Sequence, residues 1–174
     1  MPENVTMPLE PRLVSQSRTI LSQIMLPEDA NPDAHVHGGT IMKIADSAAG
    51  VAAARHCRSR VVTARIDGMD FTAPVYVGNV VTVMASVNHT GRTSLEVGVR
   101  VTAENPRTGE IRHVASAYFV YVSLDDHGRP LLVPSVLPET DEDRRRMAAA
   151  IARREQRMAL LRQLYPERYS KGQD

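Results

Sequence analysis

The sequence of 174 residues contains a single cysteine, Cys57. One thiol excludes an intramolecular disulfide, and it also excludes a zinc site built from several cysteines. A lone cysteine is compatible with a reducing compartment, where structural disulfides are rare. Since a free cysteine is most often a small buried apolar group, we expect Cys57 to pack in the core rather than to act as a nucleophile.

Aromatic residues are also scarce, because there is no tryptophan and only five tyrosines and two phenylalanines are present. This scarcity weighs against a surface on which single-stranded nucleic acid stacks. A formal net charge of +1 weighs against binding to nucleic acid by bulk charge. No apolar run approaches the ~18–20 residues that span a bilayer, and the N-terminus lacks the pattern of a secretory signal. We therefore expect a soluble cytoplasmic protein with no nucleic-acid partner and no integral membrane segment.

Lysine is nearly absent, since Lys43 and Lys171 are the only two and every other basic residue is arginine. The charge is also unevenly distributed. Residues 1–143 hold 12 basic and 17 acidic side chains, whereas residues 144–174 hold 9 basic and 3 acidic ones. A hydrophobic content of 43% is enough for a sizeable core. The sequence predicts a flexible arm over residues 1–14, a mildly acidic folded body, and a basic helical extension over residues 136–174.

Hydrophobic periodicity predicts an α+β fold. Residues 61–69, 81–87, 95–101 and 114–124 alternate or are nearly all apolar, as in strands of an antiparallel sheet, and residues 19–26 form a plausible first strand. Residues 40–56 are rich in alanine and favour a helix of four to five turns that other elements embrace closely. A second helix is predicted from its cap at Thr140 to near Pro166, with an apolar stripe that includes Met147, Ile151 and Tyr165.

The chemistry is concentrated between Asn31 and Asp46. Gly38 and Gly39 mark a turn at the start of the first helix, where exposed backbone N–H groups can stabilise an oxyanion. Asp46 lies about two turns inside that helix and can act as a general base or a nucleophile. Asn31 can supply a neutral hydrogen-bond donor.

From spacing alone, less specific interpretations also stand. Asp46 can be a solvated helix residue or an ion-pair partner of Lys43, and two consecutive glycines are often a plain turn. His35 and His37 lie on one face of an extended segment, but no third ligand of suitable spacing follows them, so we expect no metal site.

Several segments in the same order along the chain resemble the hotdog-fold acyl-CoA thioesterases, in the branch that contains the bacterial acyl-CoA hydrolases and the brain acyl-CoA hydrolase. These segments are residues 31–46, 62–78, 91–97, 118–125 and 128–130. The resemblance covers about residues 15–135, which we expect to be the catalytic domain. It implies a long central helix wrapped by a curled antiparallel sheet, and it implies hydrolysis of acyl-CoA to a free acid and CoA without metal or cofactor.

The resemblance also implies an assembly and a set of site residues. It implies a homodimer with a continuous sheet, commonly assembled as a trimer of dimers, in which Asn31 and Asp46 come from opposite protomers. The amides of Gly38 and Gly39, chiefly Gly39, would polarise the thioester carbonyl. The remaining residues that the resemblance places near substrate or CoA are His37, Arg65, Gly68, Met69, Arg92, Thr93 and Ser94. Thr93 or Ser94 would position Asp46 or the thioester.

Two positions depart from the family pattern: Ala34 stands where glycine is frequent, and His37 stands where an aromatic residue such as phenylalanine is frequent. Ala34 restricts the loop that carries Asn31. His37 places a titratable group beside the two glycines and keeps open a hotdog enoyl-CoA hydratase, in which a histidine is paired with an acid such as Asp46. A non-catalytic acyl-CoA-binding protein is the other alternative.

The acyl pocket and the basic extension remain open at this stage. Met42, Ala49 and Ala53 would help to set the acyl-chain length if they face the pocket. The arginines of residues 144–154 can form a solvated helix face, pack on another protomer, or meet CoA phosphates, an acidic face of the body or an anionic membrane surface. Solvation is the favoured interpretation, and Arg65 and Arg92 are the phosphate-binding candidates within the body.

Overall fold

The computed structural model describes residues 9–169. The elements in chain order are β1 (Arg12–Leu13), a 3-10 turn (Val14–Ser17), β2 (Thr19–Ile24), a 3-10 turn (Pro27–Asp29), α1 (Gly38–Cys57), β3 (Arg60–Phe71), β4 (Val80–Thr90), β5 (Ser94–Asn105), β6 (Glu110–Leu124), β7 (Val136–Leu137) and α2 (Asp141–Leu164). Residues 1–8 of the predicted arm lie outside the described range, whereas Arg12–Leu13 pair in parallel with β7.

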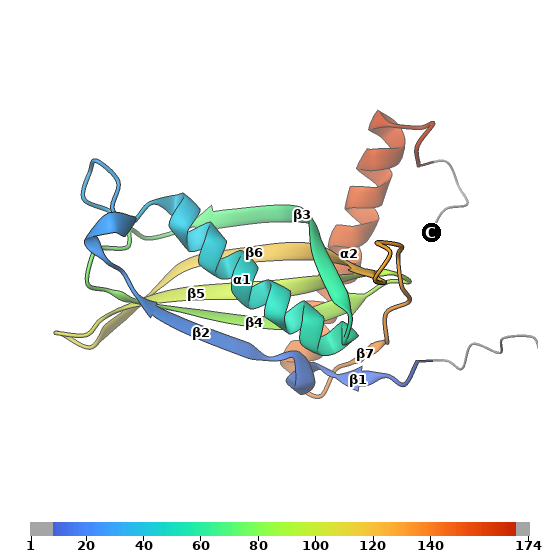
Figure 1. Ribbon diagram of the computed structural model, residues 1–174, viewed down its shortest axis with the longest axis horizontal. Helices are drawn as coiled ribbons and strands as arrows, with labels where there is room; N and C mark the ends of the chain where they lie inside the picture. Colours follow the sequence, from blue (N-terminus) through green and yellow to red (C-terminus); the bar gives the residue numbers. More distant parts are fainter. Residues whose placement is uncertain (1–8, 170–174) are drawn as a thin grey trace, which may run out of the picture.

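The five long strands form one antiparallel sheet in the order β2-β4-β5-β6-β3. The α1 helix lies diagonally across one face of this sheet, which curls around it (Figure 1). The prediction of an embraced alanine-rich helix is confirmed, because its buried side includes five alanines with no exposed surface: Ala45, Ala48, Ala49, Ala52 and Ala53. Small side chains let the helix approach the sheet closely, and the core lies between the two.

The predicted strands and helices are present with their ends shifted by a few residues. Helix α1 begins two residues earlier than predicted, because the two glycines already have helical geometry and His37 caps them. Alternating burial along β4 and β5 matches the expected strands with one buried face. Strand β3 is an edge strand whose residues are mostly exposed, and its pairing with β6 is interrupted at two places.

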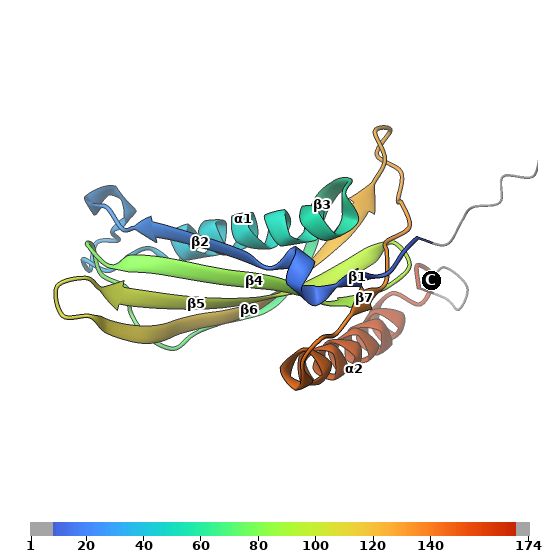
Figure 2. The ribbon, with the colours of Figure 1, turned by 90° about the horizontal axis from the view of Figure 1, so that it is seen from below.

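Helix α2 packs on the face of the sheet opposite to α1 (Figure 2). The contact face differs from the predicted apolar stripe. Met147 packs against the core and Ala150 is buried, whereas Ile151 and Tyr165 are exposed. The difference arises because arginine side chains, rather than large apolar ones, fill the rest of this contact. Within residues 9–169, no helix has the length and hydropathy required to cross a membrane.

Candidate active site

Asp46 lies in the middle of α1, half-buried, and its carboxylate is held by two hydroxyl groups. The Thr63 hydroxyl donates to Asp46 Oδ1 at 2.8 Å, and the Tyr121 hydroxyl lies 2.8 Å from the same oxygen. Tyr121 also lies 2.9 Å from the backbone carbonyl oxygen of Asp46. Both hydroxyls approach Oδ1, so Oδ2 is the oxygen left for other chemistry.

The two hydroxyls reach Asp46 together because Thr63 on β3 and Tyr121 on β6 are direct cross-strand partners. Side chains of such a pair project from the same face of a sheet. Burial and the contact with Asp46 raise the pKa of Tyr121, which keeps this phenol protonated and therefore a donor.

The sequence analysis assigned no role to Thr63 or Tyr121, although both lie in segments predicted to be strands; their proximity follows from the pairing of β3 with β6. The sequence instead suggested Thr93 or Ser94 as positioning groups for Asp46. Both lie at the β4–β5 turn, where the Thr93 carbonyl oxygen accepts from the Ser123 N–H. The described hydrogen bonds of the Asp46 side chain are those to Thr63 and Tyr121.

Asn31 lies in the loop before α1, and its side chain organises that loop. Asn31 Oδ1 accepts from the backbone N–H of Asp33 at 3.0 Å and of His35 at 3.1 Å. Ala34 takes a left-handed conformation with φ of 60°, which explains why glycine suits this position. With its oxygen engaged, Asn31 presents its amide NH₂ as a donor. Within one chain, no described interaction joins Asn31 to Asp46.

His37 occupies the N-cap of α1, and its side chain is hydrogen-bonded to the backbone N–H of Gly39, the predicted oxyanion donor. Its Nδ1 accepts a hydrogen bond from the Gly39 N–H at 3.0 Å. The N–H groups of Thr40 and Ile41 donate to the His37 carbonyl oxygen. Among the described hydrogen bonds, the Gly38 N–H has no acceptor. Thus Gly38 offers an open donor, whereas Gly39 offers a donor that His37 already caps.

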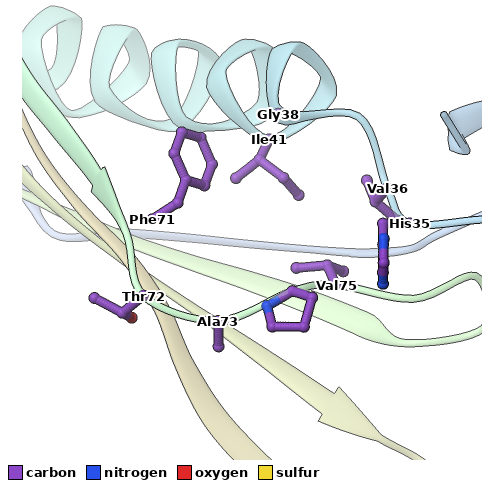
Figure 3. A pocket seen from close by; sticks show the side chains of 9 residues that line it. His35, Val36, Gly38, Ile41, Phe71, Thr72, Ala73 and Val75 are labelled. Atoms are coloured by element: carbon purple, nitrogen blue, oxygen red, sulfur yellow. The ribbon is translucent and has the colours of Figure 1, made fainter. Parts of the chain in front are cut away.

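A cleft of about 430 Å³ adjoins the start of α1. Figure 3 shows the ring of Phe71 close to Gly38 and Ile41, with residues 72–75 forming the opposite wall. The Phe71 ring comes within 3.6 Å of the position that a Cβ on Gly38 would take, which is ordinary van der Waals contact, so the ring packs directly over the start of α1. The lining is mainly apolar, and it includes His35, Val36, Gly38, Ile41, Phe71, Thr72, Ala73, Pro74 and Val75.

The remaining predicted contact residues lie on β3 and at the β4–β5 turn, away from this cleft lining. Arg65 is exposed and its Nε lies 2.6 Å from Asp67 Oδ1, while Gly68 has φ of +143° and Met69 packs against the core. Arg92, Thr93 and Ser94 follow one another at the turn, where Arg92 is exposed and the other two are half-buried. Neither group contacts Asp46 within one chain in the described interactions.

The positions of His37, Asp46 and Lys43 bear on three alternatives that the sequence left open: a histidine–acid pair, a metal site and an ion pair. His37 and Asp46 are nine residues apart on or at the end of one helix, about 13 Å along its axis, so they do not form a catalytic pair within a chain. No group of three or more histidine, cysteine, aspartate or glutamate side chains within residues 9–169 is arranged to hold a metal ion. No described ion pair joins Lys43 to Asp46.

Cys57 and the predicted pocket alanines are core residues. Cys57 packs against the core, and burial raises the pKa of its thiol to about 11, so the reactive thiolate is disfavoured. Ala49 and Ala53 are fully buried, and they do not line the cleft, whereas Met42 is partly exposed. Within one chain, therefore, Ala49 and Ala53 do not face this cleft, and the condition under which they would set the acyl-chain length is not met there.

Comparison with known proteins yields related sequences. The family model of the thioesterase superfamily matches residues 33–110. An uncharacterized acyl-CoA thioester hydrolase of Bacillus subtilis is 37% identical over 134 residues, which cover 77% of this chain and 78% of the relative. The cytosolic acyl coenzyme A thioester hydrolase of Rattus norvegicus is 38% identical over 139 residues, which cover 79% of this chain but 36% of that longer protein.

Solved structures match over most of the chain. A hexameric acyl-CoA thioesterase without ligand has a TM-score of 0.83 and 39% identity, covering 86% of this chain and 96% of the other. The acyl-CoA hydrolase of Staphylococcus aureus, in complex with butyryl-CoA, CoA and CoA disulfide, has a TM-score of 0.82 and 31% identity, covering 90% and 94%.

The same S. aureus hydrolase is also represented by three alanine variants, in which an asparagine, an aspartate or a threonine is replaced. The aspartate follows the asparagine by 15 positions, and the threonine follows the aspartate by 17. Both the sequence and the overall structure are similar to those of these relatives. The chain therefore belongs to the thioesterase superfamily and has the hotdog fold.

Proposed function

We propose that this protein hydrolyses the thioester of acyl-CoA to a free carboxylic acid and CoA, without a metal or other cofactor. The names of its relatives support this activity. The observation that carries the mechanism is the Asp46 carboxylate, whose Oδ1 is fixed by Thr63 and Tyr121 while Oδ2 remains available. A carboxylate oriented in this way can act on a water molecule or on the thioester carbonyl.

Asp46 uses Oδ2 either to accept a proton from the attacking water or to attack the carbonyl carbon itself. In both routes the carbonyl oxygen becomes an oxyanion, which collapses as the thiolate of CoA leaves. In the first route the acid forms directly, and the thiolate takes up the proton that Asp46 accepted from water. In the second route Asp46 is left as a mixed anhydride, which water hydrolyses to the free acid and the Asp46 carboxylate, and the proton released by that water goes to the thiolate. Backbone N–H groups at the start of α1 of the other protomer, which also supplies Asn31, stabilise that oxyanion, because they point out of a helix N-terminus. Asn31 orients the water or the tetrahedral intermediate through its amide NH₂.

The spacing of the three S. aureus substitutions supports a catalytic group of Asn31, Asp46 and Thr63. These residues of the present chain lie 15 and 17 positions apart, in the same order as the asparagine, aspartate and threonine of that hydrolase. Thr63 thus joins the two residues that the sequence resemblance had implied.

Each site is shared between the protomers of a homodimer. Asn31 and Asp46 do not meet within one chain, and edge strand β3 carries exposed apolar side chains, with Val62 36%, Ile66 37% and Phe71 48% exposed. An unpaired edge with such side chains is suited to pairing with a second copy. A continuous sheet formed through β3 would bring Asn31 of one protomer toward Asp46 of the other. The hexameric relatives support a trimer of such dimers.

The acyl group and the CoA moiety occupy different parts of the site. The apolar cleft beside Gly38 and Phe71 takes the acyl chain, while Gly68 and Met69 on β3 line the pantetheine path. Arg65 and Arg92 are exposed guanidinium groups that can bind phosphate in bidentate geometry. Thr93 and Ser94 lie next to Arg92 and complete this polar end.

Domain limits and location are part of the same proposal. Residues 15–135 form the catalytic domain, and residues 136–174 extend it, although residues 170–174 lie outside the described range. The similarity to a cytosolic hydrolase supports a place in the cytoplasm.

The decisive experiment mixes two inactive variants, N31A and D46N, and measures thiol release from acyl-CoA. Each variant alone should lose about 10²- to 10⁴-fold in kcat, as for other acid–base groups. Random subunit exchange makes half of the dimers mixed, and each mixed dimer regains one intact shared site. Activity should therefore recover to about a quarter of wild type.

Two outcomes would overturn the proposal. Failure to recover activity after verified subunit exchange would show that Asn31 and Asp46 act within one chain. A folded D46N protein that hydrolyses acyl-CoA at the wild-type rate would exclude Asp46 as the reacting carboxylate. Incubation with crotonyl-CoA tests the hydratase alternative, since hydration without thiol release would favour it.

A further inference from the structure

Two arginines on one face of α2 reach buried carboxylates of the sheet. Arg153 Nη2 lies 2.7 Å from Glu96 Oε1 on β5, and the Glu96 side chain is 4% exposed. Four residues later, the Arg157 guanidinium pairs with Asp67 on β3, where the two side chains are 12% and 9% exposed. One turn of helix separates the two contacts, so they lie on the same side of α2. This side of the basic extension is docked on the body rather than solvated.

Asp67 lies at the place where β3 bends. The pairing of β3 with β6 shifts register between Thr63 and Arg65, and again between Ile66 and Met69. Such irregularities bend a strand and increase its local twist. Figure 1 shows β3 changing direction sharply along its length, near α2. Gly68, with φ of +143°, permits a backbone conformation at this bend that other residues rarely adopt.

The bend connects two parts of the proposed site. Before it, the Thr63 hydroxyl donates to Asp46 Oδ1 at 2.8 Å. After it, the ring of Phe71 covers Gly38 at the start of α1. Since β3 is an edge strand, only β6 fixes it laterally within the chain, and that pairing is interrupted at the bend. Within one protomer, therefore, the contacts of Asp67 help to set the direction of the strand on either side of the bend.

Two arginines contact the Asp67 carboxylate, and their side chains differ in how deeply they are buried. Arg65 approaches Asp67 Oδ1 from the strand itself, and the Arg65 side chain is 44% exposed. Arg157 approaches Oδ2 from α2 and is far more buried. Without Arg157, the buried carboxylate would keep only the partly solvated Arg65 in direct contact, with Arg153 acting on it electrostatically without a hydrogen bond, and a buried charge that loses its best partner is driven toward water. The adjoining backbone would move with it.

We propose that Arg157 is a positioning residue for the thioesterase reaction: through Asp67 it fixes the bend of β3, and the bend sets Thr63 against Asp46. This inference rests on the proposed function. It gives the C-terminal helix a part in catalysis without contact with substrate. Small displacements of a catalytic constellation can lower the rate about 10²-fold, so the contact is expected to affect turnover more than binding.

The experiment compares R157M with R153M in the full chain. Methionine keeps most of the aliphatic volume and removes the charge. Arg153 is the matched control, because it anchors the same helix through hydrogen bonds to Glu96, which does not lie on β3, and acts on Asp67 only electrostatically, without a hydrogen bond. Both variants should melt at lower temperature than wild type. R157M should lower kcat about 10-fold or more with KM changed less than about 3-fold, whereas R153M should keep kcat within about 2-fold.

Two further variants, R157K and D67N, complete the test. R157K restores a positive charge near Asp67 and should recover most of the lost kcat. If R157M does not fold, D67N replaces it in the same comparison, since the amide keeps the shape of the side chain and removes its charge. Wild-type kcat in the folded variant would overturn the inference, as would equal losses of kcat in R157M and R153M.

The D46N variant, measured beside these proteins, separates the two proposals. An inactive D46N together with a fully active R157M would leave the proposed function intact and exclude the positioning role. A fully active D46N would instead exclude Asp46 as the catalytic group, whatever R157M does.

Discussion

Replacing His37 with alanine should increase hydrolysis while it destabilises the protein. In the free enzyme, Nδ1 of His37 accepts the Gly39 N–H at 3.0 Å. The thioester oxygen must take this donor from the imidazole if it is to use Gly39. An alanine side chain cannot accept the bond, so H37A leaves both Gly38 and Gly39 available. Phenylalanine, which is frequent in the family at this position, likewise has no acceptor.

The expected rise in kcat/KM corresponds to the loss of a single hydrogen bond, between Gly39 and His37, at an exposed site. A typical neutral hydrogen bond contributes about 0.5–1.5 kcal/mol net. Removing this competition corresponds to a rise in kcat/KM of about 2- to 10-fold. Loss of an N-cap costs about 1 kcal/mol of folding stability, which lowers the melting temperature by about 2–4 °C in a chain of this size.

Steady-state thiol release and thermal unfolding of H37A measure the two effects. The matched control is T140A, because the Thr140 hydroxyl caps α2 through the Asp143 N–H at 3.1 Å, and Thr140 has no part in the proposed site. T140A should lose similar stability without any gain in activity. A fall of kcat/KM by more than about 3-fold in H37A would refute the reasoning, since it would mean that His37 assists the reaction directly.

Two further predictions concern Thr63 and His56. T63V removes the hydroxyl that donates to Asp46 Oδ1 while it keeps the branched shape, so kcat should fall about 10-fold with the fold intact, as checked by thiol release and circular dichroism; an unchanged kcat would exclude this contact from catalysis. Burial lowers the pKa of His56, which is fully buried at the end of α1. Below a pH of about 6.5 the His56 side chain therefore binds a proton in the unfolded chain but not in the folded chain. As the pH is lowered through this range, the free energy of unfolding should decrease, by at most about 1.4 kcal/mol per pH unit from this group. Denaturant unfolding between pH 7.5 and 5.5 measures this slope, and the same slope in H56Q would assign it to other groups.

The repeating elements were predictable from sequence because their signals are local. Alternating valines marked β4 and β5, and the alanines of α1 marked a helix that a sheet surrounds. The order Asn31, Gly38, Gly39 and Asp46 resembles the pattern of the family, and the roles that this order implies stay a prediction. These features depend on residues that are close in sequence.

The partners of Asp46 were not predictable in the same way. Thr63 and Tyr121 are 58 positions apart, and they meet only because β3 and β6 pair in one register. The capping of Gly39 by His37 depends on a rotamer, which the sequence does not specify. The apolar stripe predicted for α2 was right at Met147, which packs against the core, and wrong at Ile151 and Tyr165, which are exposed. The docked face depends on the buried carboxylates that it meets, and not on the hydrophobicity of the helix alone.

The uneven charge of the chain follows from how α2 docks. Arg145 and Arg146, near the start of the helix, pair with Glu142 within the helix and remain in solvent. Farther along, Arg153 and Arg157 turn to carboxylates of the body that have little other access to solvent. Buried carboxylates are unfavourable unless a positive group accompanies them, so the acidic body depends on its basic extension at these two points. Because each pair is largely shielded from water, added salt should weaken this docking far less than it weakens the pairs of Arg145 and Arg146.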